Sequence, residues 1–328
     1  MRLKNDPAFY FPLESGRYEV SAGLKRLSTD FGNGPFDQQI FQFDKTFLQC
    51  RENKLTCRQG RLSKFYIEKD FTSDAQQSVN QYLIEQLCLE HPDKFRRYSH
   101  ADSFTLACLL TDENLYFDEQ YRLIKTEDAK TSIAYTSAID AIANQVQEDI
   151  SVVQLSADGH DYIAALHLCS PNHWSAAAKI GQSFMAAHQA VPHMEKLTQQ
   201  SHKLLASLSK GGPYVRFAWG LTTDRHLNHH PEAPAGGRAA AWHGRQFDAN
   251  QPELYLRVER QMLAVPKGSN IVIFLIRTYL YDVYSLQNDR QRLPQLVSAI
   301  QSMSSESLGY KKLLQSKIDI LNWIQTLS

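Results

Sequence analysis

The chain has 328 residues, and its 35 lysines and arginines are balanced by 35 aspartates and glutamates, so the formal net charge is zero. This length is enough for one large domain or two modest ones with a buried core. A balanced charge argues against a dedicated nucleic-acid binder, which normally carries a basic excess or stripe. No polybasic block suits an anionic lipid surface either. We therefore expect the partner to be a small molecule or another protein.

The sequence carries no signal for secretion or membrane insertion. Residues 1–7 lack the apolar run of a signal peptide, and the longest apolar stretch, 271–276, is too short to cross a bilayer. The five cysteines are odd in number and have no C-x-x-C spacing. That pattern fits reduced thiols better than a disulfide framework or a zinc or iron–sulfur site. We expect a cytoplasmic protein.

The expected elements divide the chain into three parts. Turn-forming residues dominate residues 1–35, which we expect to form an arm over the surface. Residues 36–290 combine β-rich runs with helical patterns, and residues 291–328 form helices packed on that domain. In chain order, the patterns predict helices over 74–95 and 132–147, strands over 150–155 and 162–168, helices over 172–188 and onward to 209, strands over 214–221, 255–263 and 270–281, and helices over 293–302 and 310–327.

This order of elements favours an α+β fold. Residues 156–160 and 267–270 are turn formers, so each joins two neighbouring strands as a hairpin. The result is a curved antiparallel sheet with helices on one face. Such a sheet can wrap a flat apolar ligand against the helix expected over 172–188.

That helix carries a stripe of small and aromatic residues. Trp174, Ala178, Gly181, Met185 and His188 follow one another at spacings of four, three, four and three, so they lie along one face. Small residues let a flat ligand approach the helix backbone. A histidine at the end of the stripe could present a nitrogen to haem iron. The alternative is that the small residues only allow close packing on the sheet and His188 is a core or cap residue.

Two of the predicted strands carry unusual polar residues. Alternation places Arg216 and Ala218 on one strand face, and Phe217 and Trp219 on the other. Arg216 could reach a carboxylate, or it could form a salt bridge at the rim.

Arg257, Glu259 and Gln261 share one face of the next strand, which is unusual unless these groups are paired or line a cavity. The following strand adds Arg277 and Tyr279. These residues favour a polar cavity, with an ordinary solvated sheet face as the alternative.

A histidine-rich loop is the remaining candidate for a metal site. Its histidines lie among prolines and glycines without a recognised ligand spacing, so a flexible loop is the preferred interpretation. Neither a dinucleotide fingerprint, a P-loop nor a nucleophile elbow is present. The candidate ligands of this loop are His226, His229, His230 and His243, with Asp224 and Glu232.

Taken together, these stretches resemble the family of haem-dependent oxidative N-demethylase-like proteins, whose core is a haem-bearing PAS-like domain. The resemblance rests on the order and spacing of five blocks, with weaker similarity back to about Pro35. The blocks are QEDI at 147–150, SPNHW at 170–174 with Lys179 and Gly181, HQAVP at 188–192, RFAW at 216–219, and LRVERQ at 256–261 followed by IRTY at 276–279.

The resemblance implies a monooxygenase component. The family's characterised activity is oxygen-dependent N-demethylation of a small secondary amine such as dimethylamine, which releases formaldehyde and the shorter amine. Haem b is the implied cofactor, with electrons from NAD(P)H through a flavin and a [2Fe–2S] centre. Because this chain lacks a cysteine set for that cluster and a nucleotide fingerprint, the reductase is expected to be a separate protein.

The resemblance also implies roles for individual residues. His188 would be the proximal ligand of the haem iron, while Arg216 and Glu259 would face the distal pocket, where a carboxylate can hold an ammonium-type substrate. Tyr279 would donate a hydrogen bond in that pocket. Residues implied to contact the cofactor are Trp174, Lys179, Gly181, Trp219 and Arg277, with Lys179 and Arg277 as propionate partners.

Two positions depart from the family pattern. Ala190 stands where a proline is usual, and Ala218 stands where a small polar amide is frequent. The second change removes a pocket hydrogen bond, which bears on amine specificity and on turnover itself. The alternatives to an enzyme are a haem-binding PAS-like sensor or carrier and an α+β protein without haem. If His188 is not the ligand, His167, His173 or His193 would be the next candidates.

Overall fold

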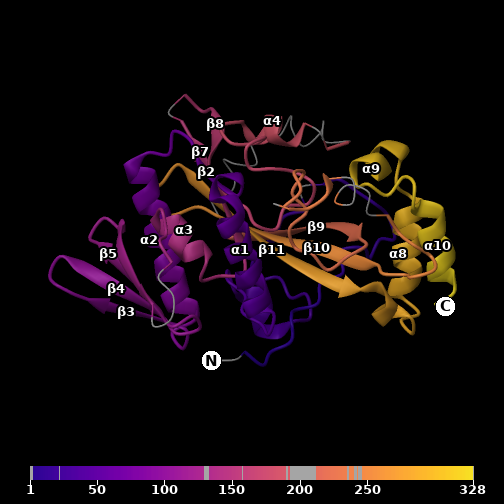
Figure 1. The fold of residues 1–328 in the computed structure, drawn as a ribbon, viewed down its shortest axis with the longest axis horizontal. Coiled ribbons are helices and arrows are strands. Elements are labelled where there is room, and N and C mark those ends of the chain that lie inside the picture. The colour runs from indigo at the N-terminus through magenta and orange to yellow at the C-terminus, as the bar shows by residue number, and fades with distance from the viewer. Residues whose placement is uncertain are drawn as a thin grey trace.

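A seven-stranded antiparallel sheet forms the centre of the computed structural model (Figure 1). Its strand order is β1-β9-β10-β11-β7-β8-β2. The described residues are 3–21, 23–128, 133–156, 158–189, 191–192, 212–234, 236–239, 242 and 246–327. The strands of this sheet are β1 (Lys25–Arg26), β2 (Tyr66–Glu68), β7 (Asp149–Leu155), β8 (Asp161–His167), β9 (Tyr214–Thr222), β10 (Tyr255–Ala264) and β11 (Ile271–Asp282).

The five long strands of this sheet confirm the five that the sequence patterns predict. Strands β7 and β8 form a hairpin, and β9, β10 and β11 form a meander whose last strand pairs with β7. Gly268 lies in the turn between β10 and β11 with a φ of +76°, a conformation that glycine adopts without steric cost. The two predicted hairpins therefore form through local turns, and the α+β class is confirmed.

A second, four-stranded antiparallel sheet was not predicted. It is covered by helix α2 (Ser73–Glu90), which ends at His91, as the His91-Pro92 pair within the expected 74–95 helix predicts. The alternating burial of β5 is typical of a sheet with one face on a core and the other in solvent. Its strands, in spatial order, are β3 (Phe95–Ser99), β4 (Ser103–Cys108), β5 (Glu113–Asp118) and β6 (Leu123–Asp128).

The helices cover the large sheet at both ends. The short helix α4 (Phe184–His188) contacts β8, whereas the C-terminal helices lie beyond the β9–β10 end (Figure 1). None of the described helices is long and apolar enough to cross a membrane. The remaining elements are η1 (Gly34–Gln38), α1 (Phe47–Arg61), η2 (Leu62–Lys64), α3 (Ala138–Ala143), η3 (Val283–Leu286), α8 (Arg292–Gln301), α9 (Ser305–Tyr310) and α10 (Lys317–Gln325).

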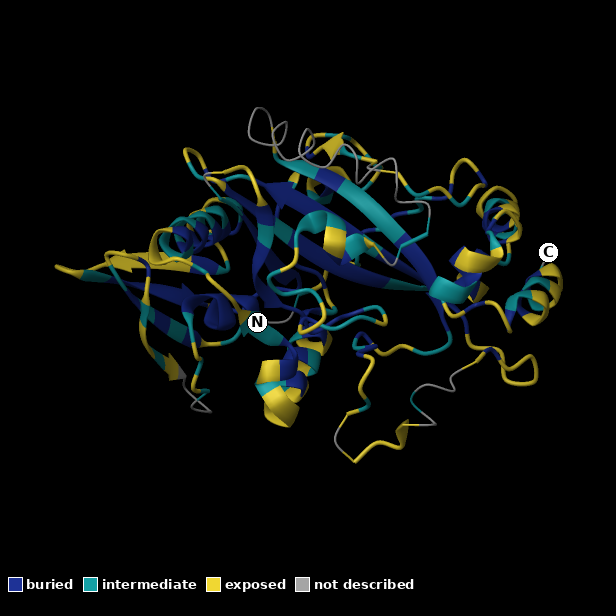
Figure 2. Cartoon of the chain, turned by 90° about the horizontal axis from the view of Figure 1, so that it is seen from above, coloured by how far each residue is buried: buried dark blue, intermediate teal, exposed yellow. Residues whose placement is uncertain are grey.

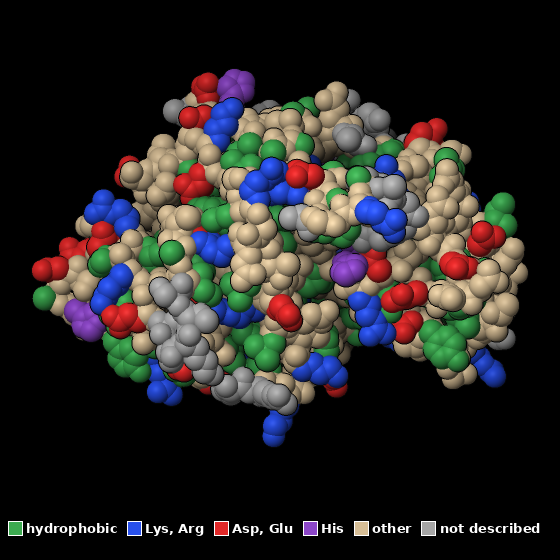
Figure 3. Space-filling view, in the orientation of Figure 1, with side chains coloured by type: hydrophobic (Ala, Val, Ile, Leu, Met, Phe, Trp, Pro, Cys, Tyr) green, Lys and Arg blue, Asp and Glu red, His purple; other side chains and the backbone are tan. Residues whose placement is uncertain are grey.

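The buried side chains form two main clusters, and the central strands are the most thoroughly buried part of the chain (Figure 2). One cluster joins α1, α2 and the small sheet to the β7–β11 region. The other joins the C-terminal helices to the opposite end of the large sheet, and it includes Tyr10 and Leu13 from the N-terminal arm. The arm is thus partly buried against the C-terminal helices. On the face drawn in Figure 3, cationic and anionic side chains are interspersed.

The prediction of a helix over 172–188 is wrong for most of its length. Only Phe184–His188 is α-helical, and the preceding residues form turns and irregular backbone. Gly181 has a φ of +75°, and a Cβ there would lie 2.7 Å from Cδ of Lys69. It therefore serves a tight turn, not a helical stripe. Of the predicted 310–327 helix only Lys317–Gln325 forms a helix (α10), since α9 ends at Tyr310. The predicted 132–147 helix shrinks to α3, and most of the helix expected up to residue 209 lies outside the described residues.

Candidate functional site

A cavity lies between the large sheet and the irregular segment that ends in α4. The part of it that the centre of a water molecule can occupy has a volume of about 210 Å³. All the empty space between its walls, including the open mouth, has a volume of about 1630 Å³. The 210 Å³, which is the value comparable with known cavities, lies below the roughly 300–1,000 Å³ of a typical small-molecule site, because much of the larger space is open to solvent. Apolar side chains from the central strands form most of its floor, namely Val153, Ile163, Leu166, Leu263, Val272, Phe274 and Ile276.

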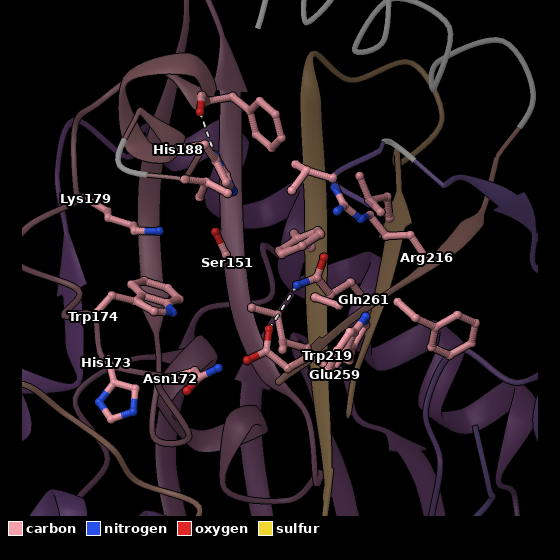
Figure 4. A pocket seen from close by; sticks show the side chains of 18 of the residues that line it. Ser151, Asn172, His173, Trp174, Lys179, His188, Arg216, Trp219, Glu259 and Gln261 are labelled. Atoms are coloured by element: carbon pink, nitrogen blue, oxygen red, sulfur yellow. Dashed lines mark hydrogen bonds between the residues drawn. The ribbon is translucent and has the colours of Figure 1, made fainter. Parts of the chain in front are cut away.

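His188 projects into the cavity from the last turn of α4 (Figure 4). The helix begins with a capping bond, because the Ser183 hydroxyl accepts from the N–H of Ala186 at 3.2 Å. At its other end, Nδ1 of His188 donates to the carbonyl of Phe184 at 2.7 Å. This bond fixes the proton on Nδ1 and leaves the Nε2 lone pair toward the cavity, with no partner among the described residues.

The electrostatic surroundings keep His188 neutral. Burial lowers its pKa to about 4, and the positive charges of Lys179 and Arg216 act in the same direction. Neutral imidazole is the form that binds a metal, and metal-ligating histidines usually donate their second N–H to a carboxylate or a backbone carbonyl. His188 has both properties.

Lys179 and Trp174 form the neighbouring wall of the cavity (Figure 4). The ammonium of Lys179 lies 4.1 Å from the ring centroid of Trp174, within the range of a cation–π contact. Burial lowers the pKa of Lys179 to about 8, partly opposed by the charge of Glu259. The pair presents a flat aromatic surface beside a cation.

The polar faces of β9 and β10 form the opposite wall. In the strand register, Arg216 lies opposite Gln261 and Ala218 lies opposite Glu259, so their side chains share the cavity face of the sheet. Glu259 accepts a hydrogen bond from Nε2 of Gln261 at 3.0 Å. The predicted polar cavity face is confirmed for these residues.

Arg257 supports this wall from within the protein. It is 1% exposed, and its guanidinium donates to the carbonyls of Ser170 at 2.6 Å and Leu227 at 3.1 Å. Its Nε lies 3.8 Å from the Glu259 carboxylate. Arg257 therefore holds Glu259 in place and joins the sheet to two loops.

The C-terminal segment contributes Tyr310 and Lys311 to the same cavity. Sequence analysis missed both residues, because it treated 291–328 only as helices packed on the domain. No local pattern could have indicated them, since Lys311 follows the last residue of α9 and its position over β9 depends on how the C-terminal helices dock.

Positive charge dominates the lining. It contains Lys179, Arg216, Arg257 and Lys311 against the carboxylates of Glu259 and the exposed Glu19. Burial lowers the pKa of Arg216 and Lys311, and Glu259 opposes the effect in both cases. The cavity is therefore suited to a ligand with an apolar body and anionic groups.

Two predicted site residues do not line this cavity. Arg277 lies opposite Arg260, and Tyr279 lies opposite Val258, so both project from the other face of the sheet. Arg277 pairs with Asp44 there at 2.9 Å, and the Tyr279 hydroxyl donates to Gln42. We correct both predictions: alternation within a strand indicates which residues share a face but not which face meets the cavity.

Two other predicted residues have different positions from those expected. Gly181 is not among the lining residues, because it serves the turn described above. Trp219 borders the cavity at the edge of the sheet and packs edge-on against Tyr18, with ring centroids 5.5 Å apart. Its contact with a ligand would thus come from the rim.

The histidine-rich loop shows no metal cluster among the residues the structure describes. His229 is buried and pairs with Asp224 at 2.9 Å, and His230 contacts the backbone of Glu232. His243, like Ala190 and His193, lies outside the described residues.

A separate buried group consists of Asp149, His167 and Cys169, whose ligand atoms lie within 4.8 Å of one another. Both Asp149 oxygens accept backbone N–H groups, from Cys169 at 3.0 Å and Ser170 at 2.7 Å, and Nε2 of His167 pairs with Asp140 at 3.3 Å. These partners explain the group as a structural network. His167 is not a lining residue of the cavity, whereas His173 is one.

The amino-acid sequence matches a known protein family. A family model described as haem-dependent oxidative N-demethylase, alpha subunit-like, matches residues 35–321. The match includes every cavity residue from Ser151 to Lys311.

Proposed function

The chain belongs to the haem-dependent oxidative N-demethylase alpha-subunit-like family, and from that premise we propose that it is a haem-b oxygenase component acting on a small secondary amine. The products would be formaldehyde and the shorter amine. The observation that carries the proposal is His188, whose Nδ1 is held by a backbone carbonyl while Nε2 faces the cavity.

The residues of the cavity fit a haem. His188 would be the axial ligand, the apolar floor would contact the porphyrin ring, and Trp174 would pack at its side. Lys179 is placed to pair with a propionate, because its ammonium faces the cavity beside His188. The five-stranded antiparallel core, with residues 168–213 inserted between its second and third strands, supports the PAS-like part of the proposal.

Bound haem would supply the activation of oxygen, with electrons from NAD(P)H through a separate flavin and [2Fe–2S] reductase. Overall, the amine R–NH–CH₃, O₂, NAD(P)H and H⁺ give R–NH₂, HCHO, H₂O and NAD(P)⁺. The role of the chain in this reaction is to bind and orient the amine substrate. The Glu259 carboxylate accepts a hydrogen bond from the ammonium of the substrate, Gln261 and Arg257 hold that carboxylate, and the apolar floor excludes water.

An absorption spectrum tests the cofactor. The purified protein reconstituted with haem b should give a Soret band, and His188→Ala should lose stable binding. His173→Ala removes another histidine of the same cavity and is the matched control. A Soret band unchanged by His188→Ala would overturn the ligand assignment, and no Soret band in the wild type would end the haem proposal.

Turnover tests the reaction. The reconstituted protein, supplied with NADPH, a surrogate reductase and dimethylamine, should release formaldehyde. A haem protein that releases none under conditions where the haem is reduced would be a sensor or carrier. Ala218 supports the sensor or carrier alternative, because the methyl group that it places opposite Glu259 cannot form a hydrogen bond.

A further inference from the structure

Lys311 reaches the cavity by crossing the backbone of β9 at a glycine. A Cβ built on Gly220 would lie 3.7 Å from Cδ of Lys311 and 3.9 Å from its Nζ. Such a Cβ would be in ordinary van der Waals contact with the lysine stem, so the C-terminal segment packs closely against β9 at Gly220. This packing brings an ammonium group to a site built mainly by the sheet.

The ammonium of the half-buried Lys311 differs from that of Lys54, which is 1% exposed. Nζ of Lys54 donates to the carbonyls of Ala143 at 2.7 Å and Val146 at 3.0 Å, and also to that of Glu148. Nζ of Lys311 has neither a hydrogen bond nor an ion pair with any residue the structure describes, although it lies in the cavity wall. Nζ of Lys311 lies 5.7 Å from the centroid of the Tyr310 ring, a contact that does not neutralise its charge. Charges withdrawn from water are normally paired with an opposite charge, so an ammonium in the cavity wall without an anionic partner among the described residues indicates a site for an anion.

Arg216, on β9, also lacks a charged partner. Its Nε is buried without a hydrogen-bond partner in the described structure, and no ion pair of its guanidinium is found there. Glu259 does not neutralise either cation by direct contact, since its carboxylate is engaged by Gln261 and lies beside Arg257. Two unpaired cations of different geometry therefore face one part of the cavity.

We propose that Lys311 and Arg216 form a carboxylate-binding subsite for the ligand that fills the cavity. The inference rests on the proposed function and extends it to a specific chemical group. Arginine and lysine together suit a carboxylate because the guanidinium offers a planar fork and the ammonium a compact charge. The carboxylate could be a propionate of haem, or it could belong to an N-methylated amino acid as substrate.

Haem titration separates the two sources. Wild type, Lys311→Met and the control Lys312→Met, a change at the neighbouring exposed lysine, are titrated with haem b and with haem b dimethyl ester, and the Soret band is followed. If the subsite holds a propionate, Lys311→Met should weaken haem b binding on the order of tenfold, as expected for loss of a charge-assisted bond. It should leave the ester's affinity unchanged, and Lys311→Arg should restore most of the loss.

If haem b affinity is unchanged in Lys311→Met, the same proteins loaded with haem are titrated with N-methylglycine and with dimethylamine. A substrate carboxylate predicts about a tenfold loss for N-methylglycine alone. Equal affinities of wild type and Lys311→Met for haem b and for N-methylglycine would overturn the inference while leaving the proposed function intact. A wild type that binds no haem would instead end both.

Circular dichroism and the unfolding midpoint of each apo variant show whether the fold is retained. A Lys311→Met protein with a native spectrum, a native midpoint and no selective loss counts against the subsite. If Lys311→Met does not fold, Lys311→Gln, which keeps a polar end and removes the charge, takes its place.

Discussion

The two faces of the large sheet both carry buried arginines, but they satisfy them differently. On the face away from the cavity, Arg277 pairs with Asp44 at 2.9 Å, and Arg260 donates to the carbonyl of Gln39 at 2.6 Å. On the cavity face, Arg257 is likewise satisfied by the carbonyls of Ser170 and Leu227, whereas the half-buried Arg216 and Lys311 have no such partners among the described residues. Removing one partner of a buried pair destabilises the fold, whereas a cation left unpaired beside a cavity is available to a ligand.

The largest expected effect comes from breaking the paired face. Arg277→Met leaves the carboxylate of Asp44, which is 0% exposed, without its cation. We expect the free energy of unfolding to fall by about 3–5 kcal/mol, the usual result of removing one partner of a buried ion pair. Denaturant unfolding of the apo protein measures it.

Arg216→Met is the matched change on the cavity face, and it should leave the stability of the apo protein unchanged or higher. If both variants lose the same stability, the contrast between the two faces is wrong.

The next effect concerns the pH dependence of stability and the buried His91. Burial lowers the pKa of His91 to about 4, and its Nε2 lies 2.9 Å from the carbonyl of Phe41. The unfolded chain therefore binds more protons than the folded chain between about pH 6.5 and pH 4. Stability should fall as the pH drops through this window, by about 3 kcal/mol in total.

Denaturant midpoints measured from pH 7.5 to pH 4 test this. In His91→Gln the loss across that window should be smaller by the histidine's share. An identical pH profile in the variant would show that His91 does not carry it.

A smaller effect is expected at the carboxylate of the cavity. Glu259→Gln keeps the shape of the side chain and removes its charge, so haem binding should persist while the affinity for dimethylamine falls on the order of tenfold. Spectral titration of the reconstituted protein measures both. Gln261→Glu serves as a comparison, since it adds a charge to the same wall. Undiminished amine affinity in Glu259→Gln would place the amine elsewhere.

The smallest effect distinguishes a turn from a helix at Gly181. In a helix, Gly181→Ala would stabilise the protein by roughly 1 kcal/mol. At a φ of +75°, with Lys69 in the way, alanine should instead destabilise it by about 1 kcal/mol. The sign of the change in the free energy of unfolding shows whether residue 181 lies in a helix or in a turn. Gly159→Ala, at a φ of +84° with open space around it, isolates the cost of the backbone conformation alone.

Local patterns in the sequence were sufficient for the long strands and for one polar face. The hairpins β7–β8 and β10–β11 are closed by short turns, so these two pairings follow from nearby residues. The pairing of β9 with β10, across residues 223–254, and of β11 with β7 is long-range. Arg257, Glu259 and Gln261 share a face because alternation is a property of a single strand. His188 was likewise found in the cavity, although the helix that was expected to carry it is only its last five residues.

Tertiary structure alone decided which of these residues meet. Alternation could not say that Arg277 and Tyr279 face Asp44 and Gln42, because that depends on what packs against each side of the sheet. Lys311 enters the cavity only because the C-terminal helices dock over Gly220, a contact between segments about ninety residues apart. The sequence by itself determined strands, turns and the sequence of polar positions, which depend on local sterics and periodicity. Which cations remain unpaired beside the cavity was decided by long-range packing.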